Sequence, residues 1–544
     1  MILPIVPKRN MRYNIAIKRF YLMKKRFFLY IFKSLFLFDR FARADDGRTD
    51  TAVRTSALLL KKELPGQKRE VEIMRILALE SSTTSAKAMF YDTETKETRV
   101  ETAAYGQMYE DGVLHNPETV YEKTIEAGRK VLQGQEAEVV SLCTAWHSVC
   151  LFHKDMRPAT PLYPWSYTGA SGICKELRKD ESYTKRYYHT TGCMVNATYP
   201  FFKLLLLKEQ GYRLEDYYIM GQGSYNTWRL TGERVVTQCM VAGSGLLDVH
   251  QRTYASDLLK EAEIPEKSLS KLIGYDKIYP LSEDGAKALG LKKGIPVVPA
   301  NSDGGLNQVG VGALAKGVMT FSVGTSGAIR LTTQQALIPE KPSTWCYLSP
   351  KAYLSGAAVA GCCNCIDWLR EKVGSGISYS DLESGVDDTI DTPVFLPFVF
   401  GERCPGWEDE RGGGFYDLKA HHDIKAMYRA VQEGILFNIY HCYQMLTEIN
   451  EEPTKIKLSG GILNSESWVQ MCADIFNREM EVDEVQQGSL MGAVVLAMDL
   501  MGLIRAEEFS VEPSRVIRPN PKNAGKYQEK FQRYLKYYYL EQQK

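Results

Sequence analysis

Two segments far apart in the chain share one pattern: an apolar strand, a turn of small residues, and a second strand. The first segment, from Ile76, reads ILALESSTTSAKAMFYD. The second, from Val318, reads VMTFSVGTSGAIRLTT, with Thr325 in the place of Thr83. Strand-forming runs on both sides of a small turn predict a β-hairpin. Because the hairpins stand near the starts of the two halves, they indicate a duplicated fold whose tips face a shared cleft.

The turns of the two hairpins are small and rich in hydroxyl groups. Small residues let backbone N–H groups approach a phosphate chain, and Ser or Thr hydroxyls add further donors. The alternative is a plain turn, since Gly, Ser and Thr are common turn residues, and it would be favoured for either tip alone. The matched pair favours a phosphate cradle. Neither turn contains GxxxxGK[ST], which argues against a P-loop nucleotide-binding protein.

An acidic residue follows the apolar strand in IPVVPANSDGGLNQVG, where a tight turn is expected to present Asp303. In open α/β sheets, ligands bind at the carboxyl ends of strands. Phosphoryl transfer to an alcohol needs a carboxylate that orients the hydroxyl and accepts its proton, with magnesium to offset the phosphate charge. Asp303 fits the first role, and Glu80, at the end of the first strand, could hold Mg²⁺ through water. The alternatives are an Asx turn at Asp303 and a solvated strand end at Glu80.

The chain of 544 residues is too long for one ordinary core, so two domains are expected, over residues 74–316 and 317–544, with a ligand cleft between them. Its apolar content of 44% and charged content of 24% are typical of a soluble protein, and no stretch is long and apolar enough to span a bilayer. We therefore expect a cytoplasmic protein without a membrane partner. The sequence leaves the oligomeric state open, with a homodimer as one possibility.

Residues 1–73 differ from the rest of the chain in charge. They hold 17 Lys or Arg against 7 Asp or Glu, a net charge of +10, so the remainder carries 1 − 10 = −9. A negative body without a basic stripe argues against a nucleic-acid partner. Residues 24–44 have the outline of a secretory signal, but the codons permitted before Met74 resemble a ribosome-binding site. We expect Met74 to be the true start; the alternative is a genuine basic arm, disordered or at a membrane surface.

The 12 cysteines lie between Cys143 and Cys472, and no pair of CxxC motifs sets up a zinc site. A reduced, cytosolic protein fits this pattern best. The CCxC cluster of Cys362, Cys363 and Cys365 could bind a soft metal. Its Ala/Gly/Val surroundings favour core packing, because small buried thiols pack like alanine.

In order along the chain, these motifs resemble the FGGY carbohydrate kinases over roughly residues 75–500. Seven further segments contribute to the resemblance: VSLCTAWHS, RPATPLYPW, TWRLTGE, SGLLDV, FGERCPGW, LSGGILNSESWVQMCADIF and SLMGAVVLA. The resemblance implies an α/β fold of two actin-like or ribonuclease-H-like domains around an ATP and sugar cleft. It also implies ATP and Mg²⁺ as cofactors and a small sugar or sugar acid as the partner molecule.

The resemblance also assigns roles to residues. It implies that Asp303 is the catalytic base and contacts substrate and metal, with Glu80 as the second metal residue. The residues it implies at the nucleotide are Thr83, Thr84, Ser85, Gly324 and Thr325 at the phosphates and Gly460, Gly461 and Ser465 at the adenosine. The alternative for Ser465 is a plain helix cap, since Ser followed by Glu466 also marks a helix start.

Within the family the sequence is most similar to gluconate kinases, because SDGGLNQVG and VGTSGAIR resemble their versions of these stretches. TAWHS then implies substrate contacts by Trp146 and His147, although a lone histidine is more often packed. Two positions depart from the family, which commonly has an acidic residue and an arginine where this chain has Tyr167 and Gly169. An arginine there would grip a hydroxyl or carboxylate, so its absence leaves the exact substrate open.

Gluconate phosphorylation is therefore the expected function, and two alternatives remain. Within the family, the alternative is a kinase for xylulose or another pentulose. Outside the enzymes, it is a catalytically silent, sugar-sensing actin-like protein, which the altered segment after Trp165 suggests. The presence of Asp303 and of both phosphate tips argues against this last reading.

Overall fold

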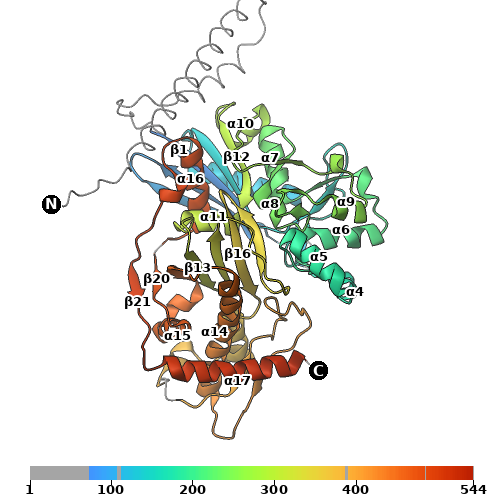
Figure 1. The fold of residues 1–544 in the computed structure, drawn as a ribbon. Coiled ribbons are helices and arrows are strands. Elements are labelled where there is room, and N and C mark those ends of the chain that lie inside the picture. The colour runs from blue at the N-terminus through green and yellow to red at the C-terminus, as the bar shows by residue number, and fades with distance from the viewer. Residues whose placement is uncertain (1–72, 107–111, 386–389, 484, 543–544) are drawn as a thin grey trace, which may run out of the picture. The chain divides into compact units, whose positions relative to one another are not determined.

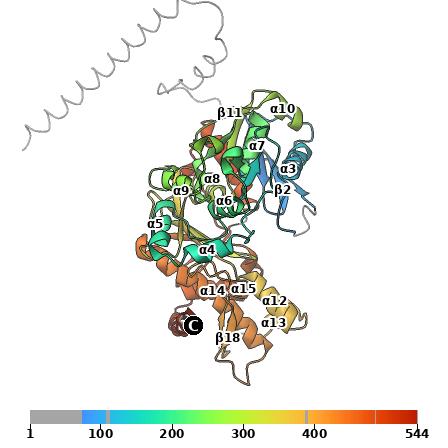
Figure 2. The same ribbon diagram turned by 90° about the vertical axis from the view of Figure 1, so that its right-hand side faces the viewer.

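The structure, a computed structural model, describes residues 73–106, 112–385, 390–483 and 485–542. The expected leader, apart from Ile73, lies outside the described residues. Residues Val71–Lys544 form one compact unit, and the description below concerns this unit (Figures 1 and 2).

The first sheet has the strand order β11-β12-β4-β1-β2-β3. Strands β1, β2 and β3 pair antiparallel in succession, while β4 is parallel to β1 and β12 is parallel to β4. Helix α3 (Pro117–Leu132) lies beside β2 on one face of this sheet (Figure 2). The strands are β1 Arg75–Ser81, β2 Ser85–Asp92, β3 Thr98–Ala104, β4 Val139–Thr144, β11 Tyr279–Pro280 and β12 Pro296–Ser302.

The second sheet repeats this plan with the order β15-β16-β14-β13-β19-β20-β21. Strands β13, β14 and β16 pair antiparallel in succession, β19 is parallel to β13, and β20 is parallel to β19. Both predicted hairpins are present, as β1–β2 and β13–β14, and each supplies the first two strands of its sheet in chain order. The mixed α/β fold of two related domains is thus confirmed. The strands are β13 Val318–Val323, β14 Gly327–Thr333, β15 Trp345–Ser349, β16 Ala352–Val359, β19 Lys455–Ser459, β20 Met480–Val482 and β21 Arg515–Ile517.

Helices cover the two large sheets, and the remaining short strands pair with each other in two-stranded sheets. The remaining helices are α4 Ser171–Leu177, α5 Glu181–Thr191, α6 Pro200–Glu209, α7 Gln222–Thr231, α8 Gln238–Ala242, α9 Ser256–Glu261, α10 Glu283–Leu289, α11 Asp303–Gly310, α12 Cys363–Trp368, α13 Tyr379–Glu383, α14 Ile424–Ile449, α15 Glu466–Phe476, α16 Gly488–Leu500 and α17 Ala524–Gln542. The short strands are β5 Cys150–Phe152, β6 Tyr218–Met220, β7 Val235–Thr237, β8 Leu247–Asp248, β9 Thr253–Tyr254, β10 Lys271–Ile273, β17 Val394–Leu396 and β18 Gly414–Tyr416.

Helices α11 and α16 cross at backbone contact. A Cβ atom at Gly310 would overlap the backbone of Gly488 and Gly492, and one at Gly492 would overlap the carbonyl oxygen of Leu306. Helix α16 is apolar on most of its surface and packs on the first sheet beside β1, although it belongs to the late part of the chain (Figure 1). A helix that is apolar all round is a buried helix. This crossing therefore joins the late part of the chain to the first strand.

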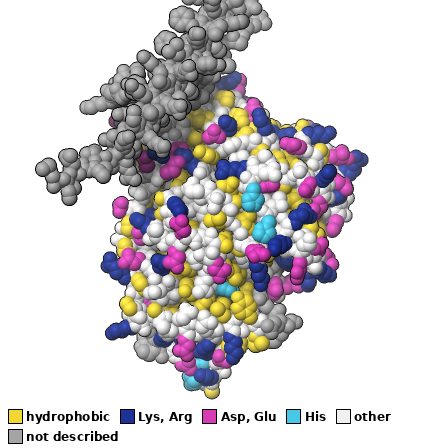
Figure 3. Space-filling model, in the orientation of Figure 1, with side chains coloured by type: hydrophobic (Ala, Val, Ile, Leu, Met, Phe, Trp, Pro, Cys, Tyr) yellow, Lys and Arg dark blue, Asp and Glu magenta, His cyan; other side chains and the backbone are white. Residues whose placement is uncertain are grey.

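All 12 cysteines are free thiols. Cys362 and Cys365 are fully buried, which confirms the expected core packing for these two, while Cys363 is half-buried. Among the described residues, no helix has the length and hydropathy needed to cross a membrane. On the face drawn in Figure 3, Lys and Arg side chains are interspersed with Asp and Glu.

The helix crossing predicts a large loss of stability on Gly492→Ala, because the new methyl group would meet the Leu306 carbonyl, which cannot move without shifting α11. Overpacking of this kind costs about 1–3 kcal/mol or more of unfolding free energy. Gly525→Ala is the control, since nothing lies within 4 Å of a Cβ there. Urea unfolding of both variants measures the effect. Equal stability of Gly492→Ala and the parent would contradict the close crossing.

Candidate active site

Asp303 is the first residue of α11, directly after β12. The expected tight turn is therefore wrong: the strand passes straight into a helix, because the Ser302 hydroxyl caps it by accepting the N–H of Gly305 at 3.0 Å. The Oδ1 atom of Asp303 accepts the N–H of Gly304 at 2.7 Å. Burial raises the pKa of Asp303, while the Gly304 N–H and the charge of Arg330 oppose the rise. These two groups favour the ionised carboxylate.

Glu80 is buried at 3% exposure, so the solvated strand end considered from the sequence is wrong. Its side chain lies on the β1 face that packs against α16, where Oε1 accepts the Ser489 hydroxyl at 3.0 Å. The other oxygen, Oε2, is buried without a hydrogen-bond partner among the described residues. Burial, and then the charge of Asp303, raise the pKa of Glu80 to about 7. The charge of Asp303 therefore acts on Glu80, the other predicted metal residue.

The first phosphate tip joins β1 to β2. The Ser82 N–H and hydroxyl both donate to the Ser85 carbonyl, at 3.1 and 2.7 Å, which closes the turn. The Thr83 hydroxyl accepts the indole N–H of Trp165 at 2.9 Å, and Thr84 is exposed. The Thr83 hydroxyl hydrogen stays available as a donor.

The second tip joins β13 to β14. The Gly324 N–H donates to the Ser326 carbonyl at 3.0 Å, and Thr325 is exposed. Gly460, with φ of 97°, lies so close to this tip that a Cβ atom would overlap the Val323 carbonyl. The structure thus brings together the predicted residues Gly324, Thr325, Gly460 and Gly461.

Ser465 has a structural role. Its hydroxyl accepts the N–H of Trp468 at 3.3 Å and caps α15, as the plain-cap alternative predicts.

Trp146 lies beside Asp303. Its ring is packed so closely on Gly304 that a Cβ there would be 2.5 Å away, and its indole N–H donates to the Cys239 carbonyl at 2.9 Å. His147 has a left-handed φ of 67°, and its Nδ1 atom is hydrogen-bonded to the Gly243 carbonyl. Burial lowers the pKa of His147 to about 3. His147 is therefore a neutral, packed ring at physiological pH.

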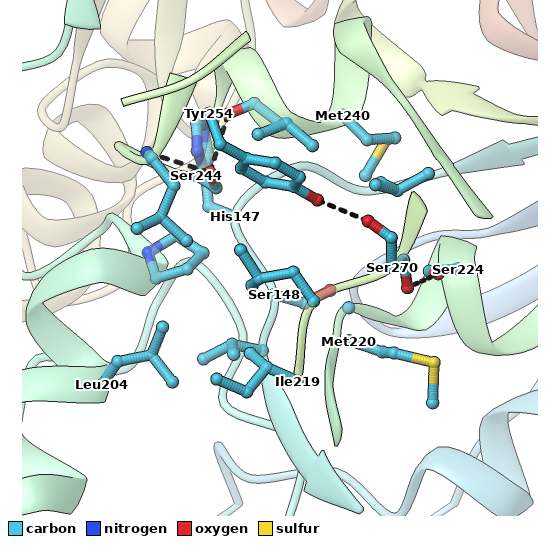
Figure 4. A pocket seen from close by; sticks show the side chains of 17 residues that line it. His147, Ser148, Leu204, Ile219, Met220, Ser224, Met240, Ser244, Tyr254 and Ser270 are labelled. Atoms are coloured by element: carbon cyan, nitrogen blue, oxygen red, sulfur yellow. Dashed lines mark hydrogen bonds between the residues drawn. The ribbon is translucent and has the colours of Figure 1, made fainter. Parts of the chain in front are cut away.

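Two cavities share Ser148 in their linings. The first has an empty volume of about 300 Å³ and is lined by Thr83, Trp146 and Trp165 among others. The second, of about 560 Å³, is shown in Figure 4 and has no Asp, Glu, Lys or Arg in its lining. Its polar groups satisfy one another, as where Tyr254 donates to the Ser270 carbonyl at 2.9 Å. The first cavity adjoins the predicted chemistry, whereas the second lacks groups that could act on a phosphate.

Two arginines near this site were missed in the sequence. A Cβ at Gly304 would lie 3.4 Å from the Arg330 Nε, and the Arg403 guanidinium lies 5.9 Å from the Trp165 ring. Arg330 is the one charged residue in β14, GAIRLTT. That isolated charge in an apolar strand is a signal that could have identified it.

The raised pKa of Glu80 predicts a pH effect on stability. A folded-state pKa of about 7 against an ordinary 4.5 means that the protonated carboxyl favours folding below pH 4.5 and that this contribution is lost as pH rises through 7. Glu80→Gln does not titrate but can still accept the Ser489 hydroxyl. The unfolding free energy of Glu80→Gln minus that of the parent should therefore rise by about 3 kcal/mol between pH 4.5 and pH 8, because a pKa difference of one unit corresponds to about 1.36 kcal/mol.

Urea unfolding across this pH range tests the effect, with the exposed Glu94→Gln as a control. Parallel pH–stability curves for Glu80→Gln and the parent would contradict the raised pKa.

Comparison with known proteins places the chain in a family. It is 28% identical over 455 residues to a gluconokinase of Bacillus subtilis, covering 79% of this chain and 88% of that protein. It is 27% identical over 413 residues to a xylulose kinase of Lactococcus lactis, covering 73% and 82%. The crystal structure of gluconate kinase from Lactobacillus acidophilus matches with a TM-score of 0.79 at 28% identity, covering 86% of this chain and 97% of that one.

Family-level sequence models extend the match to both halves of the chain. The model of the FGGY N-terminal domain covers residues 75–310, and that of the C-terminal domain covers residues 319–500. The chain belongs to the FGGY family of carbohydrate kinases.

Proposed function

We propose that this protein transfers the γ-phosphoryl group of ATP to a hydroxyl of gluconate or a closely related sugar acid. The observation that carries the proposal is the Asp303 carboxylate at the N-terminus of α11, next to Trp146 and Arg330. The similarity to gluconokinases supports the substrate class. Xylulose is the second candidate acceptor, because xylulose kinases are also among the similar proteins.

Asp303 acts as the base in this proposal. The Gly304 N–H fixes one carboxylate oxygen, which orients the group, and the carboxylate accepts the proton of the acceptor hydroxyl as the phosphoryl group leaves ATP. The helix N-terminus and the charge of Arg330 both favour the ionised form that a base requires. Closure of two domains, with bounds at 74–316 and 317–544, would exclude water during transfer.

Magnesium would be held by Glu80 and Asp303. The buried Oε2 of Glu80 has no hydrogen-bond partner among the described residues, which fits an acceptor for the water shell that Mg²⁺ retains. Bound Mg²⁺ would offset the negative charge of the phosphates.

The nucleotide would lie between the two phosphate tips and the glycine loop. Thr83, Thr84 and Ser85 on the first tip, and Gly324 and Thr325 on the second, supply phosphate donors. Gly460 and Gly461 let the adenosine approach the backbone, and Ser465 shapes that loop by capping α15.

We place the enzyme in the cytoplasm. Its free thiols fit a reducing compartment, where ATP is also available. The proposed partner is the small acceptor molecule alone, with neither nucleic acid nor a membrane, and a homodimer is the oligomeric state that we would test first by light scattering.

A panel of sugars and sugar acids in an ADP-release assay tests the proposed function. We expect gluconate to give the highest kcat/KM. A preference for xylulose would replace the substrate but keep the reaction, whereas no sugar-dependent ADP release from any acceptor would overturn the kinase assignment.

Asp303→Asn should lower turnover by about 10²–10⁴, the usual contribution of a general base, because the amide keeps the shape but cannot accept the proton. Sugar affinity should fall only modestly. The fold should persist, since Asn can accept the Gly304 N–H in the same way. Circular dichroism checks folding, and steady-state kinetics measures the rate. Parent-like turnover in the folded variant would show that another group is the base.

A further inference from the structure

Two arginines of the second domain reach residues of the first. Arg330 lies on β14, with its Nε atom close to Gly304 at the start of α11. Arg403 lies in a loop after β17, with its guanidinium carbon 5.9 Å from the ring centres of both Trp165 and Trp407. The two side chains therefore flank the segment that contains the catalytic base and the cavity with Trp146 and Trp165 in its wall.

Neither arginine is held in a close ion pair, although the charge of Asp303 acts on Arg330 and the rings of Trp165 and Trp407 lie near Arg403. The Nε atoms of Arg330 and Arg403 are buried without a hydrogen bond, and neither guanidinium forms an ion pair within 4.0 Å with any described residue. The usual arrangement occurs nearby: Arg411 is 2.7 Å from the buried carboxylate of Glu402. A buried charge normally has such a partner, because an unpaired one is costly. The two unpaired guanidinium groups thus point to an anion that binds there.

The charges of the two arginines act on each other. Burial lowers the pKa of Arg330, and the positive charge of Arg403 lowers it further, while Asp303 opposes both. Asp303 is the carboxylate whose charge acts on Arg330, and its role as a base requires it to be free to take a proton. A second anion in this place would offset the remaining positive charge.

The first-domain loop directly after Trp165 has no arginine over residues 166–169. At Gly169 the Tyr167 ring fills the space where a side chain would begin. Tyr167 itself packs edge to face on Tyr163, at 4.9 Å between ring centres. The Arg403 guanidinium lies near the ring of Trp165, at the start of this loop. The first domain also has a cation at this loop, Lys203, but its Nζ atom donates to the carbonyls of His147, Pro164 and Thr198. Arg403 of the second domain is therefore the cation here with donors left for an added anion.

We propose that Arg330 and Arg403 together bind the carboxylate of the acceptor, so that the enzyme selects sugar acids over neutral sugars. The inference rests on the proposed kinase function. The planar, forked guanidinium matches a carboxylate through paired N–H donors. A phosphoryl group could be held in the same way, and the experiment must distinguish these two anions.

Arg330→Gln and Arg403→Gln are the test variants. Arg370→Gln is the control, because Arg370 is also half-buried but pairs with Glu371. We would measure kcat/KM for gluconate and for the best neutral acceptor of the panel, the affinity for gluconate by calorimetry in the presence of ADP, and the affinity for ADP alone. Thermal melting checks that each variant is folded.

Each test variant should lose roughly 10- to 100-fold in kcat/KM and in affinity for gluconate, the range expected for a charged hydrogen bond. In Arg403→Gln the neutral acceptor and ADP should change less than threefold, as should every measurement on Arg370→Gln. Arg330→Gln is judged by its affinity for gluconate, because the charge of Arg330 also favours the ionised form of Asp303. Arg330→Lys should recover part of the loss, since it keeps the charge but not the fork.

Equal losses for gluconate and the neutral acceptor in Arg403→Gln would overturn the inference, and would assign the arginines to the transferred phosphoryl group. So would unchanged binding of gluconate in both variants. If the parent phosphorylates nothing, the proposed function fails, but calorimetry still decides on the arginines. Gluconate binding that is lost in the variants would then support the carboxylate site, and a parent that does not bind gluconate would reject it.

Discussion

The crossing of α11 and α16 is the contact on which the site depends. Glycines at Gly310, Gly488 and Gly492 let the two backbones touch, so the starts of both helices are held against the end of β1. One start carries Asp303, and the other carries Ser489, which donates to Glu80. Two carboxylates from one domain are therefore fixed by a helix from the other. A side chain at the crossing would move Asp303, Glu80 and the second domain apart together.

The parts of the fold that follow from local chemistry could be predicted from the sequence. Small turns rich in hydroxyl groups between strand-forming runs predicted both hairpins. The apolar strand before Asp303 predicted that this residue follows the carboxyl end of a strand. The burial of Glu80 could not be predicted, because it is caused by α16, which follows 409 residues later at Ser489. The sites of Arg330 and Arg403 were missed for the same reason, since each depends on a neighbour in the other domain. For Ser465 and His147, ordinary capping and packing explain the observed contacts.

The site contains charged groups that the protein alone leaves unsatisfied. Glu80 has one buried oxygen without a hydrogen bond, and the Nε atoms of Arg330 and Arg403 also lack partners among the described residues. Such groups reduce stability, which is the usual cost of a site that is completed by its ligands. The carboxyl and the guanidinium groups have opposite charges, and they would be matched respectively by a hydrated cation and by an anion.

The position of α16 has a consequence for synthesis on the ribosome. The face of the first sheet with Ile76, Ala78 and Met89 is covered by α16, which is made late in translation. At roughly 5 to 20 residues per second, the separation of 409 residues between Glu80 and Ser489 corresponds to about 20 to 80 s of translation. For that time the nascent first domain has an uncovered apolar face. Such faces bind chaperones or aggregate, so we expect the yield of active enzyme to depend on how fast the second half is translated.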